Sequence, residues 1–515
     1  MVQSLACSHL RCKRLMLSLL LFAGGAQAWS MGSPLDGQPQ WWLQILSLSV
    51  LSGCLEHTLR WRAAMLQGFI FASTWLGGSF WWLFISMHTF GGLPAWMAAL
   101  AVLGLASVLA LYYAVACGLY VALAPRKVVS RLVLFVSLWL LAELARGQWL
   151  TGFGWAGMGY AHVDGPLATY APWLGVYGVG AIAAGLAMLL PQLWLRRGWQ
   201  RAGVLLLAVL VLRAPSLEVD WSVPAGTLEV ALLQGNIPQN EKFEIGSGVP
   251  QALNWYAEQL GHQKASLIVT PETALPLLPQ QLPEGYWAAL RQRFATGEQA
   301  ALIGIPMGSY AAGYTNAMLG LKPDQAVSWQ YDKHHLVPFG EFIPPLFKWF
   351  TRLMNIPLGD FNRGDLGQPS FEWQGQRLAA NICYEDLFGE ELGIRFLKPD
   401  TEPTIFVNVG NIAWFGNSVA IDQHLQISRM RALEFSRPFV RATNTGATAI
   451  IDHTGRVTAE LPRYTQGVLT GAVEGRTGIT PYAWWVARFG LWPLWLLGLL
   501  VLLGAWRTHR KIRGC

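Results

Sequence analysis

Long apolar runs limit this sequence to folds that a lipid bilayer can hold. A transmembrane helix needs a run of about 17–25 apolar residues. Seven such runs precede residue 221 and an eighth lies near the carboxyl end, at 14–30, 40–56, 64–87, 93–123, 132–149, 167–195, 200–217 and 482–506. The fourth and sixth runs are long enough to be tilted or to include interfacial turns. The sequence therefore predicts a polytopic α-helical membrane bundle of about eight spans.

The basic residues between these runs orient the predicted helices. Cytoplasmic loops of membrane proteins are rich in Lys and Arg. With the amino terminus in the cytoplasm, 15 of the 18 basic residues outside 221–480 lie on the cytoplasmic side, and the exceptions are Arg146, Arg213 and Arg488. The segment 221–480 then lies outside the cytoplasm. In a bacterium this is the periplasmic side of the inner membrane.

The net charge of +7 would by itself suggest a nucleic-acid partner. However, segment 221–480 holds 19 basic and 24 acidic residues, so the whole positive excess accompanies the membrane helices. We therefore expect a membrane-embedded protein that binds no nucleic acid. The first apolar run has a second interpretation, because Arg11, Lys13 and Arg14 precede it and Ala26-Gln27-Ala28 resembles a signal-peptide cleavage site.

The segment 221–480 has the pattern of a soluble domain. Apolar, β-branched runs lie at 228–237, 266–270, 300–306, 378–383, 404–409 and 440–452, and helix-like stretches lie at 250–263, 285–296 and 419–436. This alternation predicts an α/β sandwich. The expected domains are 1–220 with about seven helices, 221–480 as the soluble domain, and 481–515 as the last helix with a cytoplasmic tail.

Three reactive side chains lie at or near the ends of apolar runs: Glu272, Lys333 and Cys383. Taken singly, each has an ordinary explanation as a salt-bridge partner, a solvated lysine or an inert buried thiol. Taken together, they complement one another, because a thiolate nucleophile needs a base and a group that holds developing negative charge. Glu272 is the expected base, Lys333 with the backbone N–H of Tyr384 the expected oxyanion partner, and Cys383 the expected nucleophile.

Cysteine and histidine usage argues against a disulfide or a metal. Of the six cysteines, Cys383 is the only one within 221–480, so this segment has no internal disulfide. His334 and His335 are adjacent, and no further histidine follows at the spacing of zinc ligands. We expect no metal ion and no organic cofactor.

Several longer strings carry a resemblance. These are 234–239 (QGNIPQ), 333–342 (KHHLVPFGEF), 383–385 (CYE), 413–416 (AWFG), 429–434 (RMRALE) and 444–446 (NTG), together with Glu143, 146–147 (RG) and 150–153 (LTGF) in the apolar part. The chain resembles the bacterial apolipoprotein N-acyltransferase family, the membrane-bound branch of the nitrilase superfamily, over nearly its whole length. The resemblance favours a retained first helix over a cleaved signal peptide.

The resemblance implies a fold, a reaction and substrates. The soluble domain would be an αββα nitrilase-like sandwich. The chain would transfer a fatty acyl chain from a phospholipid, typically phosphatidylethanolamine, to the α-amino group of the diacylglyceryl-modified N-terminal cysteine of lipoproteins. Cys383 would carry the acyl group as a thioester, with Glu272 as base and Lys333 at the oxyanion. Glu341, Tyr384 and Glu385 would support these three, and the protein would act as a monomer.

The sequence departs from the family pattern at two positions. Ile412 stands where the family commonly has an acid, which removes a direct role for that acid here. Phe243 is the aromatic residue nearest to the position where the family often has Trp, so a substrate contact there would be apolar. Trp414 is a second candidate for a substrate contact.

An aromatic segment follows Glu341. Residues 342–356 are apolar and sparsely charged, which is typical of a segment that dips into a membrane surface. We expect a mobile interfacial arm whose substrate contacts are Phe347, Trp349 and Phe350; the alternative is an ordinary core helix. Two other functions fit less well: a membrane-tethered amidase that hydrolyses small amides, and a transporter with an external receptor domain, which would place charges inside its spans.

Overall fold

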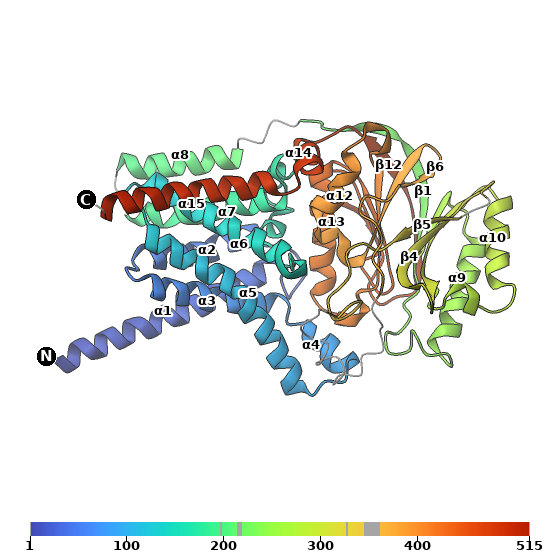
Figure 1. The fold of residues 1–515 in the computed structure, drawn as a ribbon, viewed down its shortest axis with the longest axis horizontal. Helices are drawn as coiled ribbons and strands as arrows, with labels where there is room; N and C mark the ends of the chain where they lie inside the picture. The colour runs from blue at the N-terminus through green and yellow to red at the C-terminus, as the bar shows by residue number, and fades with distance from the viewer. Residues whose placement is uncertain (1, 196–197, 214–218, 326–327, 344–360, 514–515) are drawn as a thin grey trace. The chain divides into compact units, whose positions relative to one another are not determined.

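The computed structural model describes residues 2–195, 198–213, 219–325, 328–343 and 361–513 (Figure 1). The chain separates into two compact units. The helical unit consists of Met1–Trp81, Ala95–Val219 and Leu491–Cys515, and the sandwich unit consists of Trp82–Pro94 and Asp220–Gly490. The short segment Trp82–Pro94 thus belongs to the sandwich unit, although it lies between two helices of the helical unit in the sequence.

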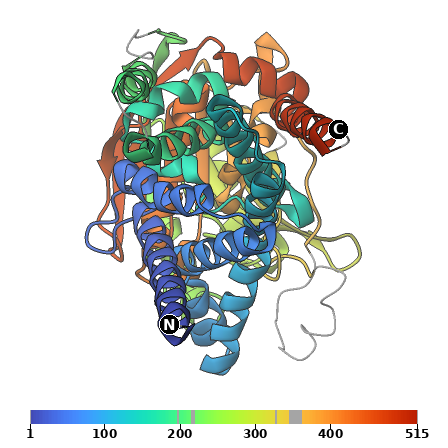
Figure 2. The same ribbon diagram turned by 90° about the vertical axis from the view of Figure 1, so that its left-hand side faces the viewer.

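The apolar runs of the helical unit form helices. They are α1 (Val2–Ser30), α2 (Trp41–Glu56), α3 (Trp61–Ser79), α5 (Ala95–Leu123), α6 (Val128–Gln148), α7 (Ala171–Leu195), α8 (Trp199–Arg213) and α15 (Trp492–Arg513). Helix α3 packs against α1 and α5, α7 packs against α2 and α6, and α15 packs against α6. Figure 2 shows these helices roughly end-on, gathered into a bundle.

Fewer helices than expected are long and apolar enough to cross a bilayer as single elements. Among the described residues three qualify: Ala95–Leu123, Val128–Thr151 and Pro166–Leu193. Two bent pairs raise the number to five, namely Trp61–Ser79 with Leu83–Phe90, bent by 61°, and Pro481–Phe489 with Trp492–Lys511, bent by 83°. The expected runs 64–87 and 482–506 are therefore broken helices. The second break falls at Gly490, whose φ of 54° favours glycine.

The sandwich unit contains two six-stranded sheets. The first sheet has the order β12-β1-β2-β3-β4-β5, and the second has the order β11-β10-β9-β8-β7-β6. The strands of the first sheet are β1 (Val223–Gln234), β2 (Leu267–Val269), β3 (Ala300–Ser309), β4 (Gly313–Leu321), β5 (Trp329–Asp332) and β12 (Gly467–Thr477). Those of the second are β6 (Phe371–Trp373), β7 (Gln376–Ile382), β8 (Ile405–Gly410), β9 (Phe439–Thr443), β10 (Ala449–Ile451) and β11 (Val457–Glu460).

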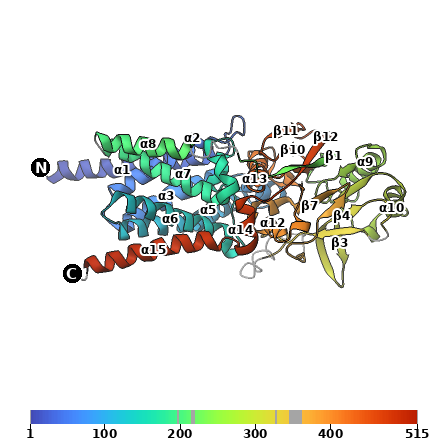
Figure 3. The ribbon, with the colours of Figure 1, turned by 90° about the horizontal axis from the view of Figure 1, so that it is seen from above.

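Helices cover the outer faces of the two sheets. Helices α9 (Gly248–His262) and α10 (Tyr286–Thr296) lie beside the first sheet, and α13 (Ala420–Phe435) lies beside the second (Figures 1 and 3). Strands β1, β2 and β3 are parallel, as are β7, β8 and β9, whereas the flanking strands pair antiparallel. This four-layer arrangement confirms the predicted α/β sandwich.

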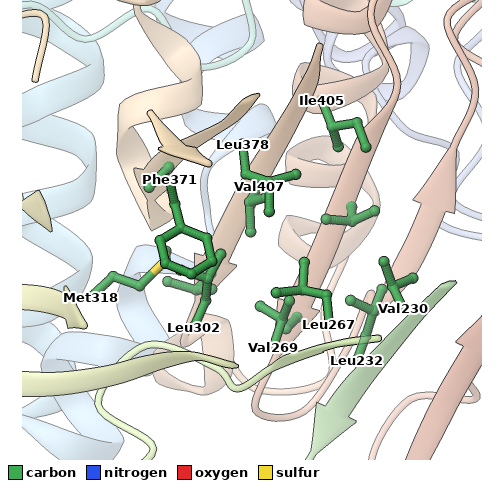
Figure 4. Close-up of a cluster of buried hydrophobic side chains, with 14 of the residues drawn as sticks. Val230, Leu232, Leu267, Val269, Leu302, Met318, Phe371, Leu378, Ile405 and Val407 are labelled. Carbon is green, nitrogen blue, oxygen red and sulfur yellow. The ribbon is translucent and has the colours of Figure 1, made fainter. Parts of the chain in front are cut away.

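The core follows the two-residue period of the strands. Val230 and Leu232 of β1 point between the sheets, whereas Ala231 and Leu233 point toward α9. Between the sheets, side chains of the first sheet meet those of the second (Figure 4), including Leu267, Val269, Leu302 and Met318 on one side and Leu378, Ile405 and Val407 on the other. Both faces of the central strands are buried, so their ends can hold polar groups in fixed positions.

The segment Trp82–Pro94 packs on the sandwich unit. It contains the short helix α4 (Leu83–Ile85) and a π-helical turn at Ser86–Phe90. The Trp82 indole donates a hydrogen bond to Gln423 Oε1 at 3.1 Å, and its ring lies 4.3 Å from that of Phe415. The ring of Phe90 meets that of Trp414 edge-on at 5.8 Å.

Candidate active site

Three strand ends bring the predicted residues to one place. Glu272 lies three residues after β2, Lys333 directly follows β5, and Cys383 directly follows β7. The Lys333 ammonium lies 3.3 Å from Glu272 Oε1 and 2.9 Å from Glu341 Oε1. Only 1% of Lys333 and 8% of Glu272 is exposed. The predicted base, the cation and the supporting acid thus form one buried ion-pair network.

Asn316, a residue that the sequence pattern did not single out, joins the two acids. It lies within β4, and its side-chain Nδ2 donates to Glu272 Oε1 and to Glu341 Oε1, both at 2.7 Å. The second oxygen of Glu341 accepts the Val337 N–H at 2.8 Å. A polar residue inside a buried apolar strand is the available signal for such a role, because burying an amide without partners is costly.

Opposite charges in the network keep one another ionised despite burial. Burial by itself would raise the pKa of the Glu272 carboxyl, but the Lys333 ammonium and the Asn316 amide hold that pKa below its ordinary value. Burial would likewise lower the pKa of Lys333, but the Glu272 and Glu341 carboxylates raise it well above its ordinary value. Glu272 is therefore an ionised carboxylate and Lys333 an ammonium in the resting site.

The charges of this network act on the Cys383 thiol. Burial raises the pKa of the Cys383 thiol, the Glu272 carboxylate raises it further, and the Lys333 ammonium opposes both. At neutral pH the side chain is therefore a thiol, which becomes a nucleophile when a base removes its proton. The backbone of Cys383 is left-handed, with a φ of 53°, a conformation that L residues rarely adopt and that is common at active sites.

Glu385 connects the strand end that precedes Cys383 to the strand end that carries Lys333. Its carboxylate accepts the Ile382 N–H at 2.6 Å, the His334 N–H at 2.7 Å and the Tyr331 hydroxyl at 2.8 Å. Burial raises the pKa of this carboxyl. These contacts connect the ends of β5 and β7, so Glu385 acts here as an anchor between the two sheets.

The ring of Tyr384 and the two histidines also serve local packing. The Tyr384 ring is buried and lies 5.6 Å from His335 and 5.2 Å from Phe388. His334 Nδ1 lies 2.8 Å from the Gly364 carbonyl oxygen, and His335 Nδ1 lies 2.9 Å from Glu391 Oε1. Across the described part of the chain, no group of three or more His, Cys, Asp and Glu side chains could hold a metal ion.

Asn411 joins two of the family-like strings, 234–239 and 444–446, beside Glu272. The Asn411 N–H donates to Glu272 Oε2 at 2.9 Å. The Asn411 side chain donates to Gln239 Oε1 at 2.8 Å and accepts from Asn444 Nδ2 at 3.2 Å. Ile412, where the resemblance leads one to expect an acid, is buried. The backbone of this loop therefore holds the second oxygen of Glu272 without an acid at position 412.

Lys242 is a second cation beside Glu272, and the sequence pattern did not single it out either. It is buried, and its ammonium donates to the backbone carbonyl of Glu272 at 3.0 Å. Burial lowers the pKa of Lys242 to about 8, although the Glu272 and Cys383 charges oppose this. Phe243, a predicted substrate contact, is 48% exposed, and its ring lies 5.9 Å from the Lys242 ammonium.

The lowered pKa of Lys242 predicts a pH-dependent stability. The folded protein binds this proton less tightly than the unfolded chain, so the charged lysine destabilises the fold below pH 8. The penalty fades as the pH rises from about 8 toward the ordinary lysine value of about 10.4. We expect the wild-type thermal midpoint to rise relative to that of Lys242→Met over this interval. Parallel midpoints for the two proteins would contradict the lowered pKa of Lys242.

The predicted substrate contacts are only partly described. Trp414 is half-buried and packs against Phe90. Phe347, Trp349 and Phe350 fall within 344–360, outside the described residues, so the interfacial arm stays a prediction.

Comparisons with known proteins identify the family. Residues 24–189 match the model of the apolipoprotein N-acyltransferase N-terminal domain, and residues 229–482 match that of carbon-nitrogen hydrolases. The chain is 57% identical to the apolipoprotein N-acyltransferase of Verminephrobacter eiseniae, over 96% of both chains. It is 47% identical to that of Ralstonia nicotianae, over 92% of this chain and 90% of the relative. Since the similarity extends across both units, the chain belongs to the apolipoprotein N-acyltransferase family.

Proposed function

We propose that this acyltransferase works through a thioester on Cys383, with Glu272 as general base and Lys333 as oxyanion partner. One observation carries the assignment: Lys333 is held between two carboxylates at the end of β5, and all three charges shift the pKa of the Cys383 thiol at the end of β7 in the second sheet. Glu341 and Glu385 position this set, and the loop with Asn411 orients the base.

The first half-reaction forms the acyl-enzyme. Glu272 accepts the thiol proton of Cys383, and the thiolate attacks the ester carbonyl carbon of a phospholipid. The Lys333 ammonium and the Tyr384 N–H stabilise the oxyanion of the tetrahedral intermediate. The ester C–O bond then breaks, the leaving alkoxide takes the proton from Glu272, and a lysophospholipid departs.

The second half-reaction transfers the acyl group. The α-amine of the acceptor attacks the thioester carbonyl, Glu272 takes a proton from the amine nitrogen, and the C–S bond breaks to give an amide. The Cys383 thiolate then regains the proton from Glu272. The near-complete burial of Lys333 and Glu272 limits the access of bulk water to this site. None of these steps uses a metal or an organic cofactor.

The substrates and location follow from the family and the sequence. As a family member, the chain is a membrane protein of the bacterial envelope that uses a phospholipid donor and lipoprotein acceptors. We further propose phosphatidylethanolamine as donor and the diacylglyceryl N-terminal cysteine as acceptor. The loop charges support eight spans in the inner membrane, with domains 1–220, 221–480 and 481–515 and the catalytic domain in the periplasm. The predicted monomer belongs to the same proposal.

Intact-mass measurement tests the proposed reaction. Wild-type protein incubated with phosphatidylethanolamine vesicles is expected to gain the mass of one acyl chain, located on Cys383 by peptide mapping. Adding a diacylglyceryl-cysteine peptide is expected to discharge this adduct and yield the N-acyl peptide. If the acyl adduct were lost to water as fast without the peptide as with it, the result would instead support the amidase-type alternative. Absence of any adduct on Cys383 would overturn the thioester mechanism.

A further inference from the structure

A buried polar cluster lies behind the nucleophile and is not used by the mechanism described above. Its members are Asp386, Asn408, His424, Ser428 and Arg441, each no more than 1% exposed. Two of them approach the backbone carbonyl oxygen of Cys383: Asn408 Nδ2 at 3.1 Å and His424 Nε2 at 3.2 Å. The cluster therefore contacts the nucleophile through its main chain.

The hydrogen-bond partners fix which atom of His424 carries the proton. Arg441 Nη2 lies 3.0 Å from His424 Nδ1, and a guanidinium can only donate. Nδ1 is therefore the acceptor, and Nε2 bears the hydrogen. That hydrogen is shared between Asp386 Oδ1, at 3.0 Å, and the Cys383 carbonyl oxygen.

The orientation of the Asn408 amide is fixed in the same way. The Asn381 side chain donates to the Val407 carbonyl oxygen at 3.2 Å, which makes Asn381 Oδ1 an acceptor. Asn408 Nδ2 lies 2.6 Å from Asn381 Oδ1 and must donate a hydrogen bond to it. The second hydrogen of the same Nδ2 then reaches the Cys383 carbonyl oxygen. Two oriented donors thus hold this oxygen.

Because Asn408 and His424 hold the Cys383 carbonyl oxygen, they also fix the direction of the Tyr384 N–H in the same peptide unit. Among the described residues the only cis peptide bond is Gly446-Ala447, so the Cys383–Tyr384 peptide is trans. In a trans peptide the C=O and the N–H point in opposite directions within one plane. With its oxygen held by Asn408 and His424, this peptide cannot rotate without losing both hydrogen bonds.

We propose that Asn408 and His424 are positioning residues that aim the Tyr384 N–H at the developing oxyanion. Asp386 and Arg441 act one step further out, since they orient the His424 ring. The cluster is no second Ser-His-Asp catalytic site. Ser428 donates to Asp386 rather than to His424, and both nitrogens of the ring have other partners. The inference rests on the proposed role of Cys383 as the acylated nucleophile.

Two substitutions of His424 test the inference in the full-length protein. His424→Leu removes the donor, whereas His424→Gln can place an amide N–H near the position of Nε2. For His424→Leu we expect the rate of acyl-enzyme formation from phosphatidylethanolamine to fall about 100-fold to 1,000-fold, the loss typical of one oxyanion-hole donor. The KM for phospholipid should stay within about twofold. His424→Gln should recover most of the rate, and Asn408→Leu should behave like His424→Leu.

Alkylation of Cys383 by iodoacetamide provides the matched control, because this reaction forms no oxyanion. We expect its rate to be nearly unchanged in all three variants. Wild-type acylation rates in His424→Leu and Asn408→Leu would overturn the inference, and so would a parallel fall in alkylation, which would indicate a damaged fold or thiol. Failure of the proposed function is distinguishable, because the wild-type protein would then acquire no acyl group on Cys383.

Discussion

Replacing Cys383 with alanine is expected to abolish acyl-enzyme formation and to lower turnover on the order of 10⁶-fold, as removal of a nucleophile does in other enzymes that work through covalent intermediates. The expected loss is this large because the remaining groups have no atom that can carry the acyl chain between two substrates. Glu272 and Lys333 would still be paired at 3.3 Å. Intact mass after exposure to phospholipid vesicles and N-acylation of a lipidated peptide measure the two effects.

Two further thiols of the chain supply a control for this substitution. Cys54 and Cys117 are also free, and Cys117 is buried. A Cys54→Ala/Cys117→Ala protein is expected to form the acyl-enzyme at close to the wild-type rate. A Cys383→Ala protein that still accumulates an acyl adduct, at any other residue, would show that Cys383 is not the nucleophile.

Replacing Lys333 with methionine is expected to damage both catalysis and stability. The substitution leaves the Glu272 and Glu341 carboxylates buried without their shared cation, although the Asn316 amide still joins them. Breaking a buried ion pair by removing one partner costs about 3–5 kcal/mol. Acylation should fall by at least about 1,000-fold, because the oxyanion donor is lost and the base takes up a proton.

A double variant separates the two effects of Lys333→Met. In Lys333→Met/Glu341→Gln only one carboxylate remains, so we expect the thermal midpoint to recover much of the loss. Acylation should remain as low as in the single variant, because the oxyanion partner is still absent. Recovery of activity together with stability would contradict a direct role of Lys333 in the reaction. No recovery of stability would contradict the shared ion-pair network.

The sequence predicts the sandwich because its central strands are continuous apolar runs separated by helical segments. It does not reveal β4, β5, β6, β11 or β12, and its run at 440–452 merges β9 and β10. In β11 every second side chain is exposed, and in β12 exposed side chains are interspersed irregularly along the strand. Both strands therefore lack the apolar run that marks a buried strand. The ends of the membrane helices are less predictable from the sequence than the strands of the sandwich. Composition alone does not show where an apolar run bends, as it does at Gly490.

Only part of the candidate active site is predictable from the sequence, because only residues at the ends of apolar runs or among apolar neighbours can be recognised locally. Glu272 and Cys383 lie where apolar strands end, and that position is readable from the local sequence. Lys333 follows β5, which is not an apolar run, so only its aromatic and apolar neighbours in the sequence point to it. Lys242 and Asn316 reach the same base from a loop and from within β4, and their roles depend on contacts over 30 and 44 positions of sequence separation. No local pattern encodes such contacts. His424 and Asn408 are hidden for the same reason, since they act on a backbone oxygen rather than on a side chain.

The sandwich unit is discontinuous in the sequence, because it includes the segment Trp82–Pro94 as well as Asp220–Gly490. A soluble fragment that begins near residue 220 would lack the Trp82 indole that covers Phe415 and hydrogen-bonds Gln423. Inhibitor screens or crystallisation trials on such a fragment would therefore meet an artificial apolar surface. Grafting the segment 82–94 through a flexible linker would restore the missing cover, and the same discontinuity limits exchange of sandwich units between relatives by simple recombination.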